Sequence, residues 1–314
     1  MILRRLVITY LFVFLVIDVM SQTTSQSIDT TSNEIDFASD TQAPMWVETL
    51  RLKYQHNRAA TKMIFDNILT RKPKALFLLG DVVNLGSSNH QWRPMDRYLE
   101  RLRENGVEVF AVLGNHEVMG QSKKGQRKFQ QRFPSHVKTG YLQVTDSIAV
   151  ILLNSNFKSL TREEENDQLN WYKYTLKKLD ADPSVDFIIT GCHHSPYTNS
   201  SIVRSSTSVR AQFVPLFLKS PKSKLFLSGH SHNFEHYKVE DKDFMVIGGG
   251  GGLHQPLKQG ADILPDIDTA YKPMFHYLTA RRKGDTLHVT SIRLKPDLSG
   301  FEEGLLLNIK GVKD

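Results

Sequence analysis

Aspartate, asparagine, glutamine and histidine residues follow five of the apolar segments of this sequence almost directly. The same kind of side chain therefore recurs in chain order, each time at the end of a short run of Val, Ile, Leu, Phe and Ala. Their carboxylate, carboxamide and imidazole groups are ligands that suit manganese, iron or zinc. The residues are Asp40, Gln42, Asp81, Asn115, His116, His193, His194, His230 and His232.

A binuclear metal site is one chemistry that such a set of side chains can support. Two metal ions about 3.5–4 Å apart can stabilise an in-line displacement at phosphorus and lower the pKa of a bound water. A carboxylate shared by both ions offsets their mutual repulsion, and Asp81 is the best candidate for that bridge. Each motif alone has an ordinary explanation, because Gly-Asp and Gly-Asn are common turn dipeptides. Their repetition after five successive apolar segments favours the metal site.

The apolar segments that position these residues have the length and composition of β-strands. They alternate with longer stretches of helical pattern, which predicts an α/β fold with mostly covered strands. In open α/β sheets, ligands bind at the carboxyl ends of the strands. The predicted strands are 35–39, 75–79, 108–113, 147–154, 185–190, 224–228 and 244–248, the predicted helices are 48–70, 91–104, 124–133, 163–179 and 209–218, and a terminal β-hairpin is predicted over 275–294.

The motifs DTQ, GDVVNLG, GNHE, HSPY and GHSH, in this order, resemble the five blocks of the calcineurin-like metallophosphoesterase superfamily. The resemblance runs from about residue 34 to about residue 255. It implies a four-layer α/β/β/α sandwich of two mixed sheets. It also implies a phosphoesterase in which a metal-bridging hydroxide attacks a phosphate ester at a binuclear centre. The family acts on monoesters and diesters alike, and we favour monoesters for this chain. The cofactors would be two divalent or trivalent metal ions, manganese, iron or zinc.

The resemblance further implies a role for each matched residue. His116 would contact the phosphoryl oxygens and assist the leaving group. His194 directly precedes Ser-Pro and matches the family ligand, which leaves His193 in the core or behind the ligands. The implied ligand set is Asp40 and His232 at the first metal, Asp81 as the bridge, and Asn115, His194 and His230 at the second metal.

Gln42 departs from the commonest family pattern, which has histidine at this place of the first block. We include Gln42 among the metal ligands, but a carboxamide oxygen is a weaker ligand than imidazole, so looser binding of the first metal or a role in holding water is expected. This residue favours the alternative function, a non-catalytic metal- or phosphate-binding protein on the same fold. His116 favours the enzyme, because a binding protein needs no further histidine beside a complete ligand set.

Substrate contacts are less well defined by the sequence. We assign Tyr197 and Arg204, together with His116, to substrate binding, although exposed solvated side chains are the alternative for the first two. Trp92 could stack on a substrate ring or pack in the core. The expected partner is a small-molecule or phosphorylated substrate. Nucleic acid is not expected, because the net charge of +7 is spread along the chain and basic and aromatic residues are not interleaved around the motifs.

The N-terminal residues differ from the rest of the chain. An apolar run from Leu6 to Ile17 follows two arginines, and its length fits a secretory signal better than a membrane-spanning helix. We therefore predict a signal peptide over 1–21, a Ser/Thr-rich linker over 22–33 and a metallophosphoesterase domain over 34–314. This predicts an exported protein, secreted or periplasmic, without stable membrane insertion. An N-terminal membrane anchor is the alternative, which Asp18 weakens.

The composition is that of a globular chain, with 40% hydrophobic and 23% charged residues. Cys192 is the single cysteine, so the chain forms no internal disulfide and has no CxxC redox or zinc motif. The stability of the fold must therefore come from its apolar core.

Overall fold

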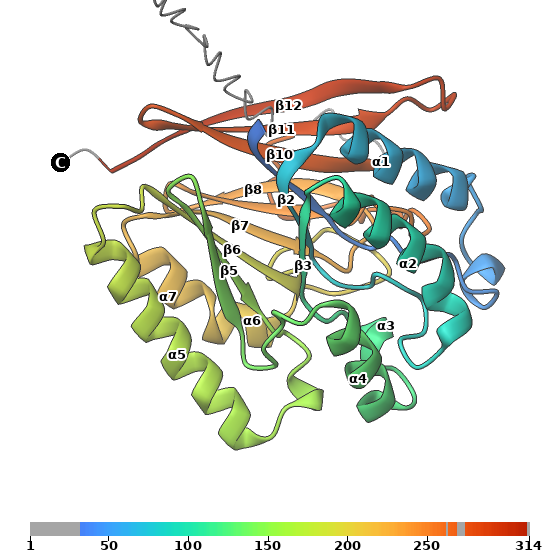
Figure 1. Ribbon diagram of the computed structural model, residues 1–314, viewed down its shortest axis with the longest axis horizontal. Helices are drawn as coiled ribbons and strands as arrows, with labels where there is room; N and C mark the ends of the chain where they lie inside the picture. Colours follow the sequence, from blue (N-terminus) through green and yellow to red (C-terminus); the bar gives the residue numbers. More distant parts are fainter. Residues whose placement is uncertain (1–31, 262, 269–273, 313–314) are drawn as a thin grey trace, which may run out of the picture. The chain divides into compact units, whose positions relative to one another are not determined.

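Twelve strands form two mixed sheets in the computed structural model, which describes residues 32–261, 263–268 and 274–312 (Figure 1). The strands are β1 (Ser32–Ala38), β2 (Pro73–Leu78), β3 (Glu108–Ala111), β4 (Tyr141–Thr145), β5 (Ile148–Leu153), β6 (Phe187–His194), β7 (Ser223–Gly229), β8 (Phe234–Val239), β9 (Lys242–Ile247), β10 (His276–Lys283), β11 (Thr286–Leu294) and β12 (Phe301–Lys310). One six-stranded sheet has the order β12-β11-β10-β1-β2-β3, and the other has the order β4-β5-β6-β7-β9-β8.

Helices cover the outer faces of the two sheets. The helices are α1 (Asn57–Arg71), α2 (Asn89–Glu104), α3 (Asn115–Val118), α4 (Ser122–Arg132), α5 (Arg162–Ala181), α6 (Thr207–Gln212) and α7 (Val214–Lys219), with short 3₁₀ turns η1 (Glu48–Leu50) and η2 (Phe157–Ser159). Figure 1 shows α1 and α2 on the β1–β3 side and α5 and α7 on the β5–β7 side. This arrangement confirms the predicted α/β fold with two mixed sheets.

Strand alternation explains the layers, because successive side chains of a strand point to opposite faces. On β1, Phe37 packs in the core between the sheets, whereas Ala38 packs against the residues of α1 and α2. Phe77 stacks on Phe37 and on Phe110 with ring centroids 5.2 and 5.3 Å apart, which joins three parallel strands on the inner face. A third apolar cluster lies between the other sheet and helices α5–α7.

The parallel strands bring the sequence motifs to one end of each sheet. β1, β2 and β3 run parallel to one another, and so do β5, β6, β7 and β9. The antiparallel pairings are those of β10 with β1, β4 with β5, β8 with β9, and the hairpin-linked β10, β11 and β12. The carboxyl ends of β1–β3, and likewise those of β6 and β7, therefore lie together.

Two predicted helices differ from the structure for local backbone reasons. The helix predicted over 48–70 begins only at Asn57, because His56 adopts a left-handed conformation with φ of 61°. The helix predicted over 209–218 is two short helices, and Pro215 stands in the first turn of the second. Proline fits a first turn, where its missing N–H is not needed, but not the interior of a helix. The predicted terminal hairpin is confirmed as β10 and β11.

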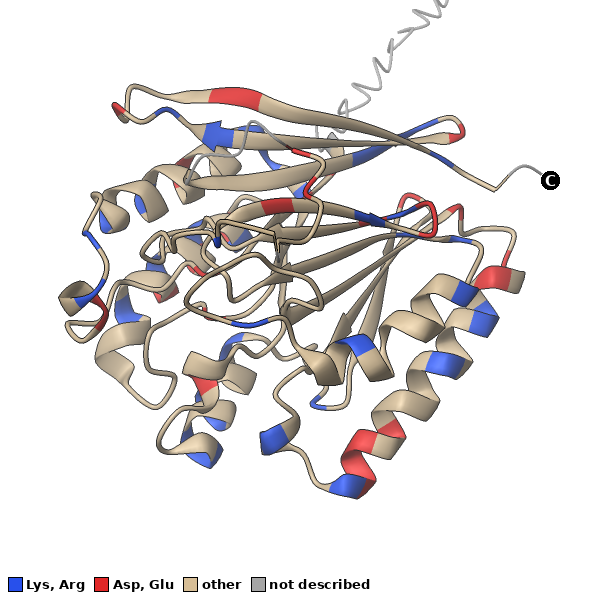
Figure 2. Cartoon of the chain, turned by 180° about the vertical axis from the view of Figure 1, so that it is seen from behind, with Lys and Arg blue, Asp and Glu red and all other residues tan. Residues whose placement is uncertain are grey.

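The first described residue, Ser32, lies within the predicted linker. The predicted signal peptide over 1–21 and most of the linker over 22–33 lie outside the described residues, and β1 begins at Ser32. Within the described ranges, no helix has the length and apolar character that crossing a membrane requires. Figure 2 shows Lys and Arg distributed over several helices and strands and interspersed with Asp and Glu.

Candidate metal centre

The ends of five strands supply one cluster of polar side chains. Asp40 and Gln42 follow β1, Asp81 follows β2, and Asn115 begins α3 soon after β3. β6 ends at His194, and the loop after β7 carries His230 and His232. Hydrogen bonds and close approaches link these residues, so the structure brings together all the side chains that the sequence motifs singled out as ligands.

Asp81 lies at the middle of the cluster. Its Oδ1 accepts a hydrogen bond from the backbone N–H of His116 at 2.8 Å, and its Oδ2 lies 3.2 Å from Nε2 of His193. Nε2 of His116 lies 3.7 Å from the same Oδ2. Burial acts to raise the pKa of Asp81, but the neighbouring His193 and His116 hold this pKa well below its usual range. Asp81 is therefore a buried carboxylate in its anionic form.

Asp40 connects the first strand end to the last motif. Both of its carboxylate oxygens accept from the backbone N–H of His230, at 3.1 and 3.0 Å, and Oδ1 lies 3.5 Å from Nε2 of His232. Asp40, Asp81 and His230 have φ values of 58°, 49° and 66°. Such left-handed conformations are uncommon for residues other than glycine and concentrate at functional sites. The backbone is thus strained where it aims these groups into the cluster.

Backbone carbonyls orient three of the histidines. Nδ1 of His232 lies 2.7 Å from the carbonyl oxygen of Leu253, and Nδ1 of His193 lies 3.0 Å from that of Leu79. Nδ1 of His116 lies 2.9 Å from the carbonyl oxygen of Asn84. A carbonyl oxygen only accepts, so each Nδ1 carries the proton and each Nε2 is turned toward the cluster. Metal-binding histidines are commonly oriented in this way.

His194 and His230 supply a second pair of imidazoles, with ring centroids 4.5 Å apart. Burial, together with the neighbouring His193, lowers the pKa of His194 to about 3. Burial likewise lowers the pKa of His230 well below the usual histidine value. Both rings are therefore neutral, which is the form of imidazole that binds a metal.

Strand alternation and a shift in strand pairing bring both His193 and His194 into the cluster. Successive side chains of a strand face opposite sides, so His193 lies on the inner face with Phe187 and Ile189, and the register of β6 on β7 shifts between Cys192 and His194, which turns His194 to the same side. Nε2 of His193 lies 3.0 Å from Oδ1 of Asn115. Ligand atoms of His193, His194 and His230 lie within 4.8 Å of one another, as do those of Asp40, Asp81 and His193. This grouping of carboxylate oxygens and imidazole nitrogens could hold metal ions.

Gln42 presents its amide nitrogen to the cluster. Its Nε2 lies 3.2 Å from Nε2 of His232. In neutral His232, the form that binds a metal, Nδ1 donates to Leu253 and Nε2 accepts, so the Gln42 amide is then the donor. The carboxamide must therefore turn over before its oxygen could meet a metal, and the nitrogen atom of His232 that would bind the first metal already accepts from Gln42.

Glu117 is a supporting residue to which the sequence analysis assigned no role. It is fully buried, and its Oε2 accepts from the backbone N–H groups of Asp81 and Gly114 at 2.9 and 2.8 Å. Its Oε1 accepts from Val83 N–H at 3.1 Å. A Cβ atom on Gly114 would overlap the Asp81 carboxylate, so only glycine fits there. Glu117 is the last residue of the GNHE motif, and its hydrogen bonds connect this third motif to the second motif, GDVVNLG. Its place in the motif was the one sign of this role in the sequence.

The run of five glycines after β9 supports the loop that carries Asp40. The N–H groups of Gly250 and Gly252 donate to the carbonyl oxygens of Ser39 and Asp40 at 2.9 and 2.8 Å. The Asn57 side chain, at the start of α1, donates to the carbonyl oxygens of Gly251 and Gly252, both at 2.9 Å. The glycine run is therefore held between α1 and the Asp40 loop.

The proposed substrate residues have different surroundings. The Tyr197 ring packs 5.2 Å from that of Phe244, with the Arg210 guanidinium 4.9 Å from its centroid, while Arg204 is exposed. Their part in substrate binding stays a prediction. Trp92 is fully buried and donates through Nε1 to the carbonyl oxygen of Gly86 at 2.8 Å, so it is a packing residue.

Comparison with known proteins agrees with this geometry. Residues 34–234 match the profile of the calcineurin-like phosphoesterases. GAP50, the anchor in the inner membrane complex of Plasmodium, has a similar structure, with a TM-score of 0.66, 15% identity and 89% of each chain covered. Purple acid phosphatase PPD1 from yellow lupin seeds has a TM-score of 0.65 and 15% identity, over 89% of this chain and 54% of that one. A dimetal phosphatase from Danio rerio has a TM-score of 0.54 and 14% identity, over 88% of this chain and 98% of that one.

A search of curated proteins finds no match to the sequence. At the identities of the solved structures, likeness in three dimensions shows the fold alone. The sequence profile goes further, since it covers more than half of the chain and all five motifs. The chain therefore belongs to the calcineurin-like phosphoesterase family and is a metallophosphoesterase.

Proposed function

We propose that the protein hydrolyses phosphate monoesters at a binuclear metal centre in which Asp81 bridges the two ions. The observation that supports this most strongly is the buried grouping of two carboxylates and several imidazoles at the ends of both sheets. The proposed ligands are Asp40, Gln42 and His232 at the first metal and Asn115, His194 and His230 at the second, with Asp81 shared.

The residues of the chain fit manganese, iron or zinc, because they offer oxygen and imidazole nitrogen atoms. Two such ions, when bound, lower the pKa of a bound water and offset the negative charge that develops on the phosphate. The chain supplies the oriented ligands. It also excludes bulk water from the carboxylates, since Asp40 and Asp81 are 0% and 1% exposed.

His116 is placed to act on the leaving group. Its Nδ1 donates to the carbonyl oxygen of Asn84, and its Nε2 is directed toward Asp81 at the centre of the cluster. A proton on Nε2 would be donated to the oxygen atom that leaves phosphorus. General acid catalysis of this kind contributes about 10²–10⁴-fold to a rate.

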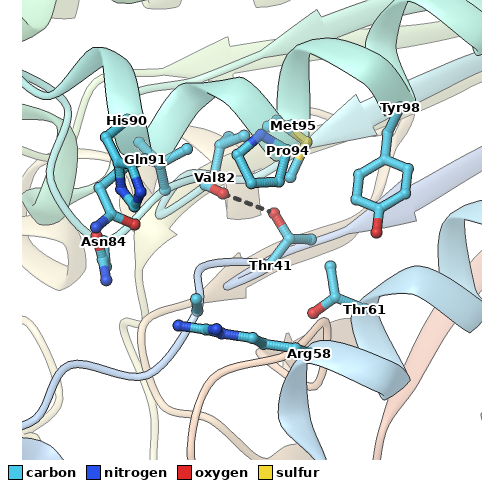
Figure 3. A pocket seen from close by; sticks show the side chains of 12 residues that line it. Thr41, Arg58, Thr61, Val82, Asn84, His90, Gln91, Pro94, Met95 and Tyr98 are labelled. Atoms are coloured by element: carbon cyan, nitrogen blue, oxygen red, sulfur yellow. Dashed lines mark hydrogen bonds between the residues drawn. The ribbon is translucent and has the colours of Figure 1, made fainter.

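The preference for monoesters rests on charge. A cavity of about 380 Å³ is lined by Thr41 and Asn84, from the loops that carry the ligands after β1 and β2, and Arg58 and His90 also line it (Figure 3). Among the described residues that line this cavity, there is no Asp or Glu. A phosphate monoester carries one negative charge more than a diester near neutral pH, and a cavity beside the ligand loops without carboxylates in its lining does not repel that charge.

The second candidate function is a non-catalytic metal- or phosphate-binding protein. The hydrogen bond from Gln42 to His232 favours it, because this bond competes with the first metal for His232. A protein with one metal ion, or none, and no hydrolysis would match this candidate.

The test compares aryl phosphates on the purified protein supplied with manganese, iron or zinc. We expect 4-nitrophenyl phosphate to be hydrolysed faster than bis(4-nitrophenyl) phosphate. Asp81→Asn should abolish hydrolysis, because the shared ligand loses its charge. Asp285→Asn, an exposed carboxylate in the β10–β11 turn, is the matched control and should keep full activity. A diester preference would overturn the monoester proposal, and near-normal turnover by Asp81→Asn would overturn the binuclear one.

We also propose that residues 1–21 are a cleaved signal peptide and that the domain that begins near residue 34 is exported. The support is the length of the apolar run in the sequence. Expression of the full chain, followed by N-terminal sequencing of the released protein, tests this. A released protein that begins after residue 21 is expected, whereas a full-length chain that stays with the membrane fraction would indicate an anchor.

A further inference from the structure

The cavity beside the metal centre has the size of a small-molecule site, at about 380 Å³. It lies between the first turn of α1 and one face of α2. Figure 3 shows Arg58 extending along one side of it, with His90 and Gln91 of α2 across from the guanidinium and Thr41 between the two helices.

The cavity shares its wall with the metal cluster. Thr41 stands between Asp40 and Gln42, and its Oγ1 donates to the carbonyl oxygen of Val82 at 3.1 Å. Asn84 lines the cavity, and its carbonyl oxygen accepts from His116. The cavity therefore opens on the side of the cluster where His116 stands, which is the side toward which a leaving group would depart.

The chemistry of the lining is that of an anion site with an apolar wall. Arg58 forms no ion pair with any described residue, and its guanidinium faces the end of the cavity that holds Asn84 and His90 (Figure 3). Val82, Pro94 and Met95 supply apolar surface along the same cavity. Arginine binds carboxylates and phosphates through paired hydrogen bonds.

We propose that this cavity binds the leaving group of the substrate, and that this leaving group carries a second anionic group held by Arg58 and His90. The second anion is a carboxylate or a further phosphate, attached to a part of the substrate that packs on the apolar wall. The inference rests on the proposed hydrolysis of monoesters at the metal centre.

Two matched substrates test the proposal. 4-Carboxyphenyl phosphate and 4-carbamoylphenyl phosphate have the same shape and differ by one negative charge on the leaving group. We expect the wild-type protein with restored metals to show a higher kcat/KM for the carboxylate, and Arg58→Gln to reduce the ratio of the two values about tenfold. Arg93→Gln, an exposed arginine of α2 outside the cavity lining, should leave the ratio unchanged.

The change in ratio cancels differences in the intrinsic reactivity of the esters. Adenosine diphosphate and adenosine monophosphate form a second pair, and a larger effect of Arg58→Gln in this pair would identify the second anion as phosphate. An unchanged ratio in both pairs would overturn the proposal. An equal loss for both members of each pair would also overturn it, since Arg58 would then bind the phosphate that is cleaved.

Calorimetric titration of the same protein with 4-hydroxybenzoate and 4-hydroxybenzamide gives a readout that does not depend on hydrolysis. We expect tighter binding of the carboxylate, lost in Arg58→Gln and kept in Arg93→Gln. If no ester is hydrolysed but this preference is seen, the proposed function fails while the anion cavity stands. If hydrolysis is seen and both compounds bind alike, the cavity proposal fails alone.

Discussion

Replacing Gln42 by histidine should tighten the first metal site. The Gln42 amide donates to Nε2 of His232 at 3.2 Å, and both residues are buried. A metal must break this bond before it can bind His232. A neutral hydrogen bond contributes about 0.5–1.5 kcal/mol, and 1.4 kcal/mol corresponds to about tenfold in affinity. Removal of the competing bond alone therefore raises the affinity for the first metal by about 2- to 12-fold.

Gln42→His also adds an imidazole, which is a better ligand than a carboxamide, so the total gain should exceed about tenfold. Gln42→Leu separates the two effects, because leucine removes the hydrogen bond and adds no ligand. If Gln42 only competes for His232, Gln42→Leu should raise the affinity for the first metal by the smaller factor of about 2- to 12-fold. If the Gln42 oxygen is itself a ligand, Gln42→Leu should lower that affinity.

Competition titration with a metal chelator measures the two binding steps separately. Gln130→His, which places a histidine on an exposed position of α4, is the control for nonspecific metal binding and should leave both steps unchanged. An unchanged first step in Gln42→His would refute the reasoning, since it would mean that residue 42 does not face the first metal.

Three further variants probe the proposed catalytic histidine, a buried tyrosine and a buried histidine. His116→Ala should lower kcat by about 10²–10⁴-fold while the protein keeps its metals; loss of a metal in the same variant would make His116 a ligand. The Tyr141 hydroxyl donates to the carbonyl oxygen of Ala111 at 2.7 Å and accepts from the N–H of Ala111 at 2.9 Å. Tyr141→Phe leaves both backbone groups without this partner, at about 1–3 kcal/mol each, and should lower the free energy of unfolding by about 2–6 kcal/mol. An unchanged urea midpoint would contradict this. Burial lowers the pKa of His136 to about 4, below its value in the unfolded chain, so only the unfolded chain gains this proton as the pH falls from about 6.5 to 4. The free energy of unfolding therefore declines in that window by about 3 kcal/mol. The urea midpoint of His136→Phe should fall less between pH 7.5 and 4.5 than that of the wild type, and an equal fall would place the acid sensitivity elsewhere.

Much of the site was predictable because its signals are local. Each ligand motif directly follows an apolar strand, and parallel strands bring their carboxyl ends together whatever the loops between them contain. Asp81 and His232 could therefore be singled out from residue type and position alone. The strands that the sequence analysis missed are β4, β8 and β12, which lie at sheet edges. Edge strands carry polar and exposed residues, as β12 does along most of its length, so their apolar alternation is weak.

Other features of the site depend on contacts between distant segments. His194 joins His193 in the cluster through a shift in the pairing of β6 with β7, which no pattern of apolar residues indicates. Glu117 accepts hydrogen bonds from the N–H groups of Asp81 and Val83, which precede it by 36 and 34 residues in the sequence. A single Glu after a histidine does not reveal such partners. The donor role of Gln42 follows from the bond between His232 and Leu253, which only the folded chain shows.

Metal content, measured together with hydrolysis, tests the central claim most directly. The purified protein, supplied with manganese, iron or zinc and then freed of excess metal, is analysed by mass spectrometry of its metals and assayed with 4-nitrophenyl phosphate. The binuclear proposal predicts about two metal ions per chain and clear hydrolysis. It also predicts that Asp81→Ala loses the pair of metal ions and the hydrolysis together. One metal ion or none, without hydrolysis under any metal supplied, would contradict it and favour the binding protein.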